Sequence, residues 1–234
     1  MDDGSVNLVG ILPEEPSVGM DDLLGPWLET VAADGGSYPY TVYREHGDHE
    51  DGESSDRAEL SELVRGSSTV KLGRARGGQL VRYRDLEVTV TVRGPDCPYH
   101  LAPCWRVWTD QYQFRPALQP GDTAAERTEQ LLDLARTAHL RTGSVYTYAQ
   151  RFAQVFDSSV HVDAGRVRAG GLDELYWLTV LGPDTVDAAG RDALLAAGAD
   201  RAEPLEDGSV LLVIGDTPVE REVPAFRRFR DGLG

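Results

Sequence analysis

The chain has 234 residues, and its hydrophobic fraction of 41% excludes global disorder and suffices for a packed core. Its 39 acidic residues outnumber 23 basic ones, and the formal net charge of −16 argues against a nucleic-acid or anionic-lipid partner. Because no apolar run approaches the roughly 18 residues of a membrane span, and the acidic start Met1-Asp2-Asp3 is unlike a secretory signal, we expect a cytoplasmic protein without a membrane segment.

The N-terminal part of the chain is rich in short apolar segments of strand character. Strands are predicted over residues 6–12, 38–43, 69–72, 79–83, 86–92 and 105–108, and Val88, Val90 and Val92 alternate most clearly with polar residues. Apolar residues at helical spacing predict helices over 19–33 and 57–64. Residues 44–58 hold almost nothing apolar, which predicts an exposed acidic loop.

Two prolines and a glycine in residues 115–121 mark the best candidate boundary in the chain. Just beyond it, Thr123 and Glu126 match a capping box and predict a helix that runs to about Leu140. Further helices are predicted over residues 146–156, 183–197 and 224–233, and strands over 174–181 and 209–214.

This order of elements predicts an α+β protein of two packed halves, each a small, mostly antiparallel sheet with helices on one face. The N-terminal half spans residues 1–118 and includes the acidic loop 44–58, and the C-terminal half spans residues 119–234. The pattern also fits one continuous domain, so the sequence leaves open whether the halves are separate domains.

The common catalytic motifs are absent from the sequence. There is no phosphate-binding loop, dinucleotide-binding turn, nucleophile elbow or zinc-protease helix. Active sites also assemble from distant residues, so this does not exclude an enzyme. His161 and Asp163 lie two apart on a predicted strand and could form an acid–base pair, although a surface pair is the simpler interpretation.

One compact segment contains metal-ligand residue types. Cys97, His100 and Cys104 follow a Cys-x2-His-x3-Cys pattern, which could supply three of the four ligands of a zinc ion. No second pair of ligands lies nearby in sequence, so the alternative is a proline-rich turn with two buried thiols and no cofactor. The zinc interpretation implies a zinc-dependent enzyme, and a small-molecule sensor with a site near these residues is a further alternative.

A second segment is dense in aromatic residues. Trp105, Trp108, Tyr112 and Phe114 follow one another closely, and Trp177 could join them through the fold. Such residues can anchor a partner protein or line a ligand pocket. The alternative is that they pack in the core between the two halves.

The basic residues are unusual in kind as well as in number. Lys71 is the only lysine, and the other 22 basic residues are arginines. An acidic surface poor in lysine resembles the proteins of haloarchaea, in which carboxylates keep the surface hydrated at high salt. A GC-rich genome would explain the missing lysine but not the excess of acid.

The C-terminal region carries a resemblance to a known family. It lies in three segments, Glu174 to Pro183, Gly190 to Leu195 and Glu206 to Leu212, followed by the Pro218 turn and the segment that begins at Pro224. Over about residues 174–230 this pattern resembles the bacterial type VI secretion immunity proteins. The resemblance implies an α+β protein that neutralises an effector protein by binding it, without catalysis. It lies in apolar framework positions, so it implies no particular site residues.

Overall fold

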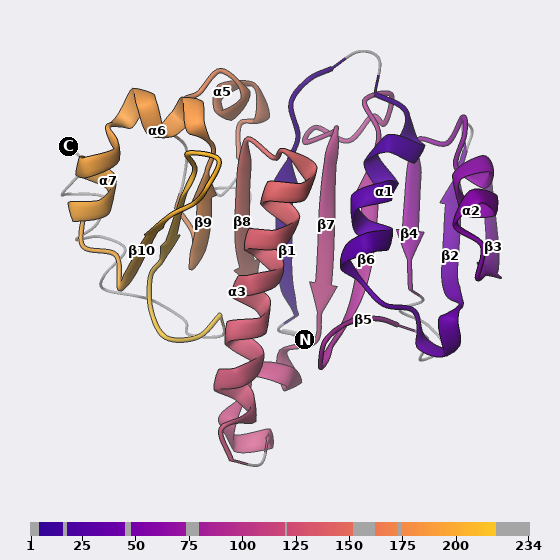
Figure 1. Cartoon of the computed structure of the whole chain (residues 1–234), viewed down its shortest axis with the longest axis horizontal. Helices are drawn as coiled ribbons and strands as arrows, with labels where there is room; N and C mark the ends of the chain where they lie inside the picture. The colour runs from indigo at the N-terminus through magenta and orange to yellow at the C-terminus, as the bar shows by residue number, and fades with distance from the viewer. Residues whose placement is uncertain are drawn as a thin grey trace.

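The structure is a computed structural model that describes residues 5–15, 18–44, 48–73, 80–119, 121–151, 162–172 and 175–218. Its strands form one open antiparallel sheet in the order β10-β11-β9-β8-β1-β7-β6-β4-β2-β3, with β5 paired to β6 (Figure 1). The strands are β1 (Val6–Ile11), β2 (Tyr38–Tyr43), β3 (His49–Ser54), β4 (Thr69–Leu72), β5 (Val81–Tyr83), β6 (Leu86–Arg93), β7 (Cys104–Thr109), β8 (Tyr146–Arg151), β9 (Leu178–Leu181), β10 (Arg201–Pro204) and β11 (Val210–Val213).

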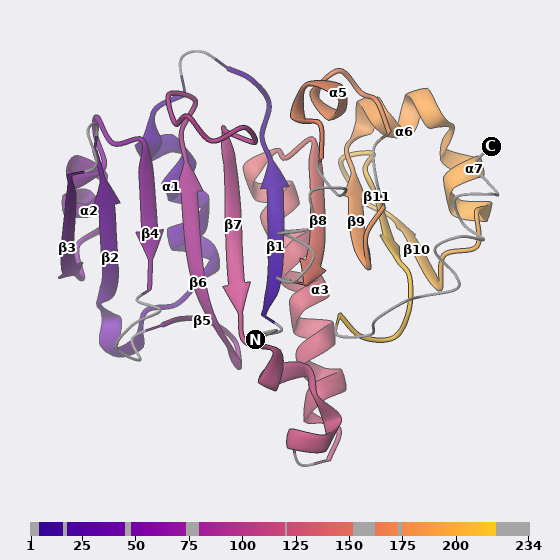
Figure 2. The ribbon, with the colours of Figure 1, turned by 180° about the vertical axis from the view of Figure 1, so that it is seen from behind.

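Helices cover the sheet unevenly. The helices are α1 (Met20–Thr30), α2 (Arg57–Leu63), α3 (Thr123–Thr142), α5 (Ala164–Arg168), α6 (Pro183–Ala189) and α7 (Arg191–Ala196). The first three pack on one face, whereas α5, α6 and α7 pack on the opposite face at the C-terminal end of the sheet. Seen from behind, β2, β4, β6 and β7 have no helix in front of them (Figure 2). No helix in the described ranges is long and apolar enough to span a membrane.

The α+β class and the antiparallel sheet predicted from the sequence are confirmed. The finer prediction of two small sheets is wrong, because the strands of both predicted halves belong to a single sheet. Strand β1 joins them, since it pairs with β7 on one side and with β8 on the other.

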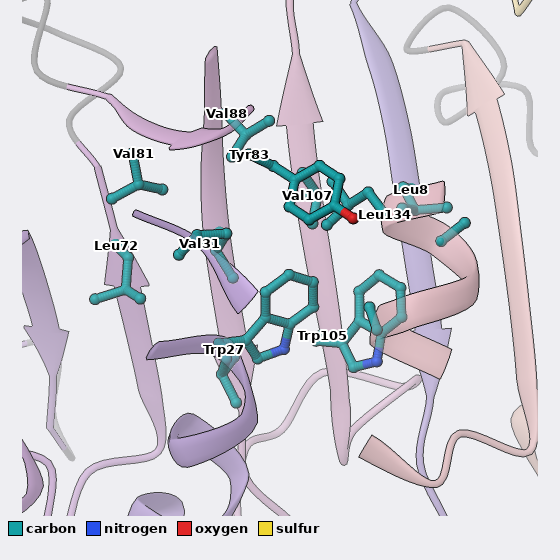
Figure 3. Close-up of a cluster of buried hydrophobic side chains, with 14 of the residues drawn as sticks. Leu8, Trp27, Val31, Leu72, Val81, Tyr83, Val88, Trp105, Val107 and Leu134 are labelled. Atoms are coloured by element: carbon teal, nitrogen blue, oxygen red, sulfur yellow. The ribbon is translucent and has the colours of Figure 1, made fainter. Parts of the chain in front are cut away.

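The core between the sheet and the first three helices centres on two tryptophans. Trp27 of α1 and Trp105 of β7 meet edge to face with ring centroids 4.9 Å apart (Figure 3). Both side chains are almost completely buried, among aliphatic residues of neighbouring strands and helices. Aromatic burial of this size makes the contact a main source of stability for the sheet.

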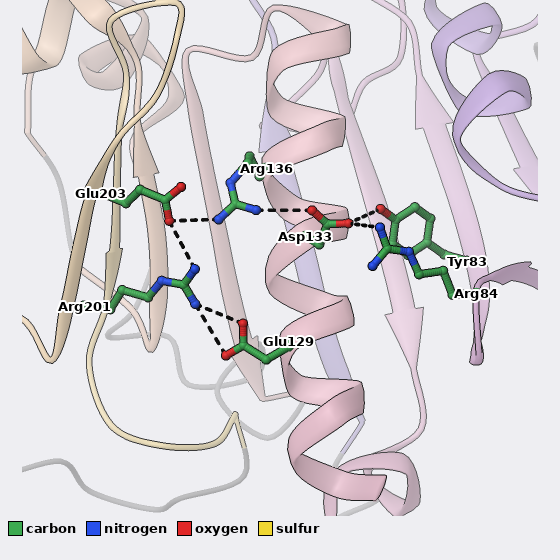
Figure 4. A network of polar contacts seen from close by, with 7 residues as sticks. All are labelled: Tyr83, Arg84, Glu129, Asp133, Arg136, Arg201 and Glu203. Atoms are coloured by element: carbon green, nitrogen blue, oxygen red, sulfur yellow. Dashed lines mark hydrogen bonds and ion pairs between the residues drawn. The ribbon is translucent and has the colours of Figure 1, made fainter.

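Polar and charged contacts join helix α3 to strands on both sides of it in the sheet. Asp133 accepts a hydrogen bond from the Tyr83 hydroxyl at 2.7 Å and pairs with Arg84, which places it against the β5–β6 hairpin (Figure 4). One turn along the helix, Arg136 contacts Glu203 of β10 at 2.8 Å. Because the network spans from β5 to the β10 edge, it fixes α3 across the middle of the sheet.

The predicted helix over residues 146–156 is wrong where the structure describes it, because residues 146–151 form the central strand β8. Tyr146 and Tyr148 point to one core and Thr147 and Ala149 face the other, so all four side chains are buried. A strand buried on both faces loses the polar alternation by which strands are recognised. Tyr148 and Phe152 happen to lie four apart, which imitates a helical stripe.

Two other predictions also need correction. The acidic loop 44–58 contains β3, an edge strand that pairs residue by residue with β2. The helix predicted over 183–197 is split into α6 and α7 at Gly190, whose φ of 86° ends the first helix. The helix predicted over 224–233 and the residue His161 lie outside the described residues.

Candidate functional site

The five aromatic residues predicted as a binding surface do not gather on one surface. Trp105 and Phe114 are fully buried and Trp177 is nearly so, and all three belong to the core under α1 and α3. Trp108, three residues after Trp105 on β7, lies on the opposite face of the sheet and is half-buried. Tyr112 is the one with an open surface position, at 54% exposed.

The three candidate zinc ligands are close in sequence but differ in environment. Cys104 is fully buried, and burial raises the pKa of its thiol to about 11, which disfavours the thiolate that zinc requires. The Cys97 sulfur lies 3.5 Å from the Thr69 hydroxyl, and the His100 ring packs on Tyr99. No group of three His, Cys, Asp or Glu side chains that could hold a metal ion occurs within the described part of the chain. The zinc site therefore stays a prediction.

A different group of side chains gathers on the side of the sheet where β2, β4, β6 and β7 have no described helix over them. Lys71 of β4, Arg93 of β6 and Arg106 of β7 lie on this face, since the alternate residues of each strand point into the core beneath α1. Lys71 lies opposite Thr91, and Thr91 lies opposite Arg106, so these three residues form one row across β4, β6 and β7. We call Lys71, Arg93 and Arg106, with Tyr99 and Trp108, the basic sheet face.

Aromatic rings hold the two arginines in place. The Arg93 guanidinium carbon lies 4.1 Å from the centre of the Tyr99 ring. The Arg106 guanidinium lies between two rings, 5.6 Å from Tyr99 and 4.9 Å from Trp108. Arg106 also donates from Nε to the Asn7 side-chain oxygen at 3.3 Å. These cation–π contacts orient the guanidinium groups but do not neutralise their charge.

The charges of the basic sheet face are not balanced by carboxylates. In the described ranges Lys71, Arg93 and Arg106 form no ion pair, whereas Arg44, Arg82, Arg84, Arg136, Arg141 and Arg201 each do. Arg106 is only 7% exposed, and its burial lowers the pKa of its guanidinium. Two buried donors nearby, Nη1 of Arg93 and Nδ2 of Asn7, have no hydrogen-bond partner among the residues that the structure describes. The basic sheet face therefore carries positive charge that no described carboxylate neutralises, and hydrogen-bond donors that no described acceptor satisfies.

Sequence reasoning missed a buried polar cluster at His139 of α3. Its imidazole contacts the Thr147 hydroxyl at 2.9 Å and the Ser209 hydroxyl at 3.0 Å, and Ser209 donates to Asp207. Burial lowers the pKa of His139 to about 4, so the ring is neutral at physiological pH. Although Ser, His and Asp occur together, the serine donates to the carboxylate and both His139 and Ser209 are fully buried, which fits a structural role. No sequence spacing could have brought α3, β8 and β11 together in advance.

One cavity lies at the end of the sheet where β1 leaves it. It encloses about 290 Å³ between the segment after β1, helix α1 and the C-terminal end of α3, and its walls include Leu12, Leu23, Pro103 and Thr142. None of the aromatic residues Trp105, Tyr112 and Trp177, which could have lined a ligand pocket, lines it.

The fold is similar to that of a solved protein. The Pseudomonas aeruginosa T6SS protein PA0821, where T6SS denotes the type VI secretion system, superimposes with a TM-score of 0.51 at 13% sequence identity. The match covers 98% of this chain and 73% of PA0821. At this identity the likeness shows a shared fold and nothing finer. Neither a protein-family model nor a curated protein matches the sequence.

Proposed function

We propose that the protein is a non-enzymatic binding module of the immunity type, which neutralises an effector protein by forming a stable complex with it. The observation that carries the proposal is the likeness of fold to a type VI secretion system protein across 98% of the chain. The pattern of residues 174–230, which resembles the immunity proteins of that system, supports the same conclusion.

The acidic edge of the sheet is the surface that we propose to meet the effector first. Residues 48–62, which include β3 and most of α2, carry seven exposed carboxylates and one arginine, Arg57. An acidic surface attracts a basic partner over several ångströms and raises the association rate more than the final affinity. Many effectors that attack nucleic acids are basic, so this edge suits such a partner.

The decisive experiment is to express the protein with the products of neighbouring genes and to purify it by affinity. We expect one neighbour to co-purify in a fixed stoichiometry, and its toxicity to growth to disappear when the two are expressed together. If no neighbour binds or is neutralised, the immunity function is excluded.

The contribution of the acidic edge can be measured once the partner is in hand. Glu50→Gln, Glu53→Gln and Glu62→Gln combined should slow association by about tenfold at low ionic strength and leave dissociation nearly unchanged. A control variant, Glu126→Gln, Asp187→Asn and Glu206→Gln, removes the same charge from exposed positions elsewhere. Equal slowing in both variants would show that net charge acts and that the edge has no special role.

A further inference from the structure

The basic sheet face concentrates positive charge in a protein whose net charge is −16. Its three cations come from adjacent strands β4, β6 and β7 and include the only lysine of the chain. Among the side chains of these strands that point away from the helices, the single carboxylate is Glu87, and it is paired with Arg82. Strands β2 and β3 continue the row of Lys71 with Thr41 and then Asp51, so the positive region ends two strands away from Lys71, at the acidic edge.

Two buried hydrogen-bond donors of this face have no acceptor among the described residues. A buried cation is costly unless a counter-charge or strong acceptors compensate it. Arg106 has one neutral acceptor, the Asn7 oxygen, and two aromatic rings. The donors Arg93 Nη1 and Asn7 Nδ2, which have no partner among the described residues, lie on the same face as Arg106. Arg93 is on the neighbouring strand β6, opposite Cys104, and Asn7 is on the other neighbouring strand, β1, opposite Trp108. An acceptor with more than one oxygen would satisfy these donors and the charge together.

We propose that the basic sheet face binds a carboxylate side chain, aspartate or glutamate, presented by a partner protein. A carboxylate has two oxygens that match the donor pair of a guanidinium, and the rings of Tyr99 and Trp108 hold the guanidinium planes ready for it. A nucleic acid is a poorer fit, because its many phosphates would meet the repulsion of the whole protein. The proposal rests on the proposed function only in taking the carrier of the carboxylate to be an effector.

The two surfaces then have separate tasks in one encounter. The acidic edge attracts a basic effector at long range, and the basic sheet face selects one acidic group on it after contact. A lone carboxylate on a basic protein is a distinctive feature, so this arrangement gives specificity that charge attraction cannot give alone.

The test uses the isolated protein and needs no effector. A ¹H–¹⁵N spectrum resolves the indole N–H of each of the four tryptophans, and we titrate with a short peptide that carries one glutamate among neutral residues, at about 0.1 M salt. The Trp108 signal should shift, because Trp108 lies beside Arg106, while the core residues Trp27 and Trp105 should not. The shift should be absent with the same peptide in which glutamine replaces the glutamate.

Variants assign the binding to these cations. Arg106→Gln should weaken binding about tenfold or more, because a charge-assisted hydrogen bond is lost. Lys71→Gln, at a less buried position, tests the same face without disturbing Arg106, and it should weaken binding by a smaller factor. Arg65→Gln, an exposed residue at the end of α2, removes the same charge elsewhere and should leave binding unchanged.

The outcomes separate this proposal from the immunity function. No shift of Trp108, an equal shift with the glutamine control peptide, or equal weakening by Arg65→Gln would overturn the carboxylate site. A stronger shift with a short thymidylate oligonucleotide would reassign the face to a phosphate ligand and also overturn it. If the Arg106→Gln and Lys71→Gln variants capture an effector as well as the wild-type protein does, the immunity function is supported and the carboxylate site is overturned. If the peptide binds as expected but no effector is found, the carboxylate site is supported and the immunity function is overturned.

Discussion

The two ends of the sheet are built differently, although they share one set of hydrogen bonds. At the C-terminal end, β9 and β11 lie between helices on both faces, and every one of their side chains is buried. At the N-terminal end, β4 and β6 have helices on one face, and threonines, Lys71, Arg93 and Glu87 occupy the other. The first arrangement serves packing alone, whereas in the second no described helix covers the face that carries the polar side chains. That difference is why we place the candidate site on β4, β6 and β7.

The largest expected effect distinguishes the two faces of a single strand. Trp105→Ala should lower the free energy of unfolding by about 3–5 kcal/mol, because it empties the space beside Trp27 in the core. Trp108→Ala on the other face should cost about 1 kcal/mol, since it loses one cation–π contact and part of a half-buried ring. Urea denaturation of both variants measures the contrast, and equal losses would contradict the assignment of the faces.

The second prediction concerns acid sensitivity at the doubly covered end. His139 has a pKa lowered by burial from 6.5 to about 4, so the unfolded chain takes up a proton there at a higher pH than the folded chain. Its contribution to stability is intact above pH 6.5 and is lost as the pH falls toward 4. The total loss is about 3 kcal/mol.

The control for this prediction is His139→Gln, which removes the titration and retains a side-chain donor. The free energy of unfolding of both proteins should be compared across this pH range, because the carboxylates common to both then cancel. A wild-type curve that runs parallel to that of the variant would show that His139 is not buried as described.

The third prediction tests the halophilic interpretation of the acidic surface. Raising KCl from about 0.1 M to molar concentration shortens the Debye length from about 10 Å to about 3 Å, and should stabilise the fold by on the order of 2 kcal/mol. The variant that neutralises Glu50, Glu53 and Glu62 at the acidic edge should gain less. A stability independent of KCl would remove the halophilic interpretation.

The smallest loss of stability is expected from the polar contacts that join α3 to β5 and β10. Asp133→Asn weakens the contacts to Tyr83, Arg84 and Arg136 together, but the site is partly exposed, so we expect a loss of about 1 kcal/mol. Arg44→Gln, which breaks an exposed pair at the other edge, is the matched control and should have almost no effect. Thermal unfolding of the two variants decides whether the network ties the ends together.

The sequence predicted the strands best at the end of the sheet that has helices on one face. Strands β8 and β3 were not predicted, for physical reasons. Val88, Val90 and Val92 alternate with threonines because one face meets helices and the other does not, so β6 was readable. β8 lost this alternation by being buried on both faces, and β3 has no apolar pattern because it lies at the edge and depends on pairing with β2. Both depend on tertiary contacts that no local pattern reports.

Less of the candidate site than of the fold could be predicted from the sequence. Alternation alone would place Lys71, Arg93 and Arg106 opposite the core-facing valines of their strands, and that signal was available. What the sequence did not contain was the strand order that makes β4, β6 and β7 neighbours, or the turn that lays Tyr99 over the arginines. Conversely, the aromatic residues that looked like a surface turned out to be mostly core.

The central position of β1 has a consequence for how the chain is made. Val6 pairs with Arg151, so β1 waits until about 145 further residues have been synthesised before both of its edges are paired. Contacts so distant in sequence slow folding, and an unpaired edge exposed meanwhile invites association with other chains. Cutting the gene at the apparent boundary near residue 118 would make that exposure permanent, and we expect the N-terminal fragment to aggregate when it is expressed alone.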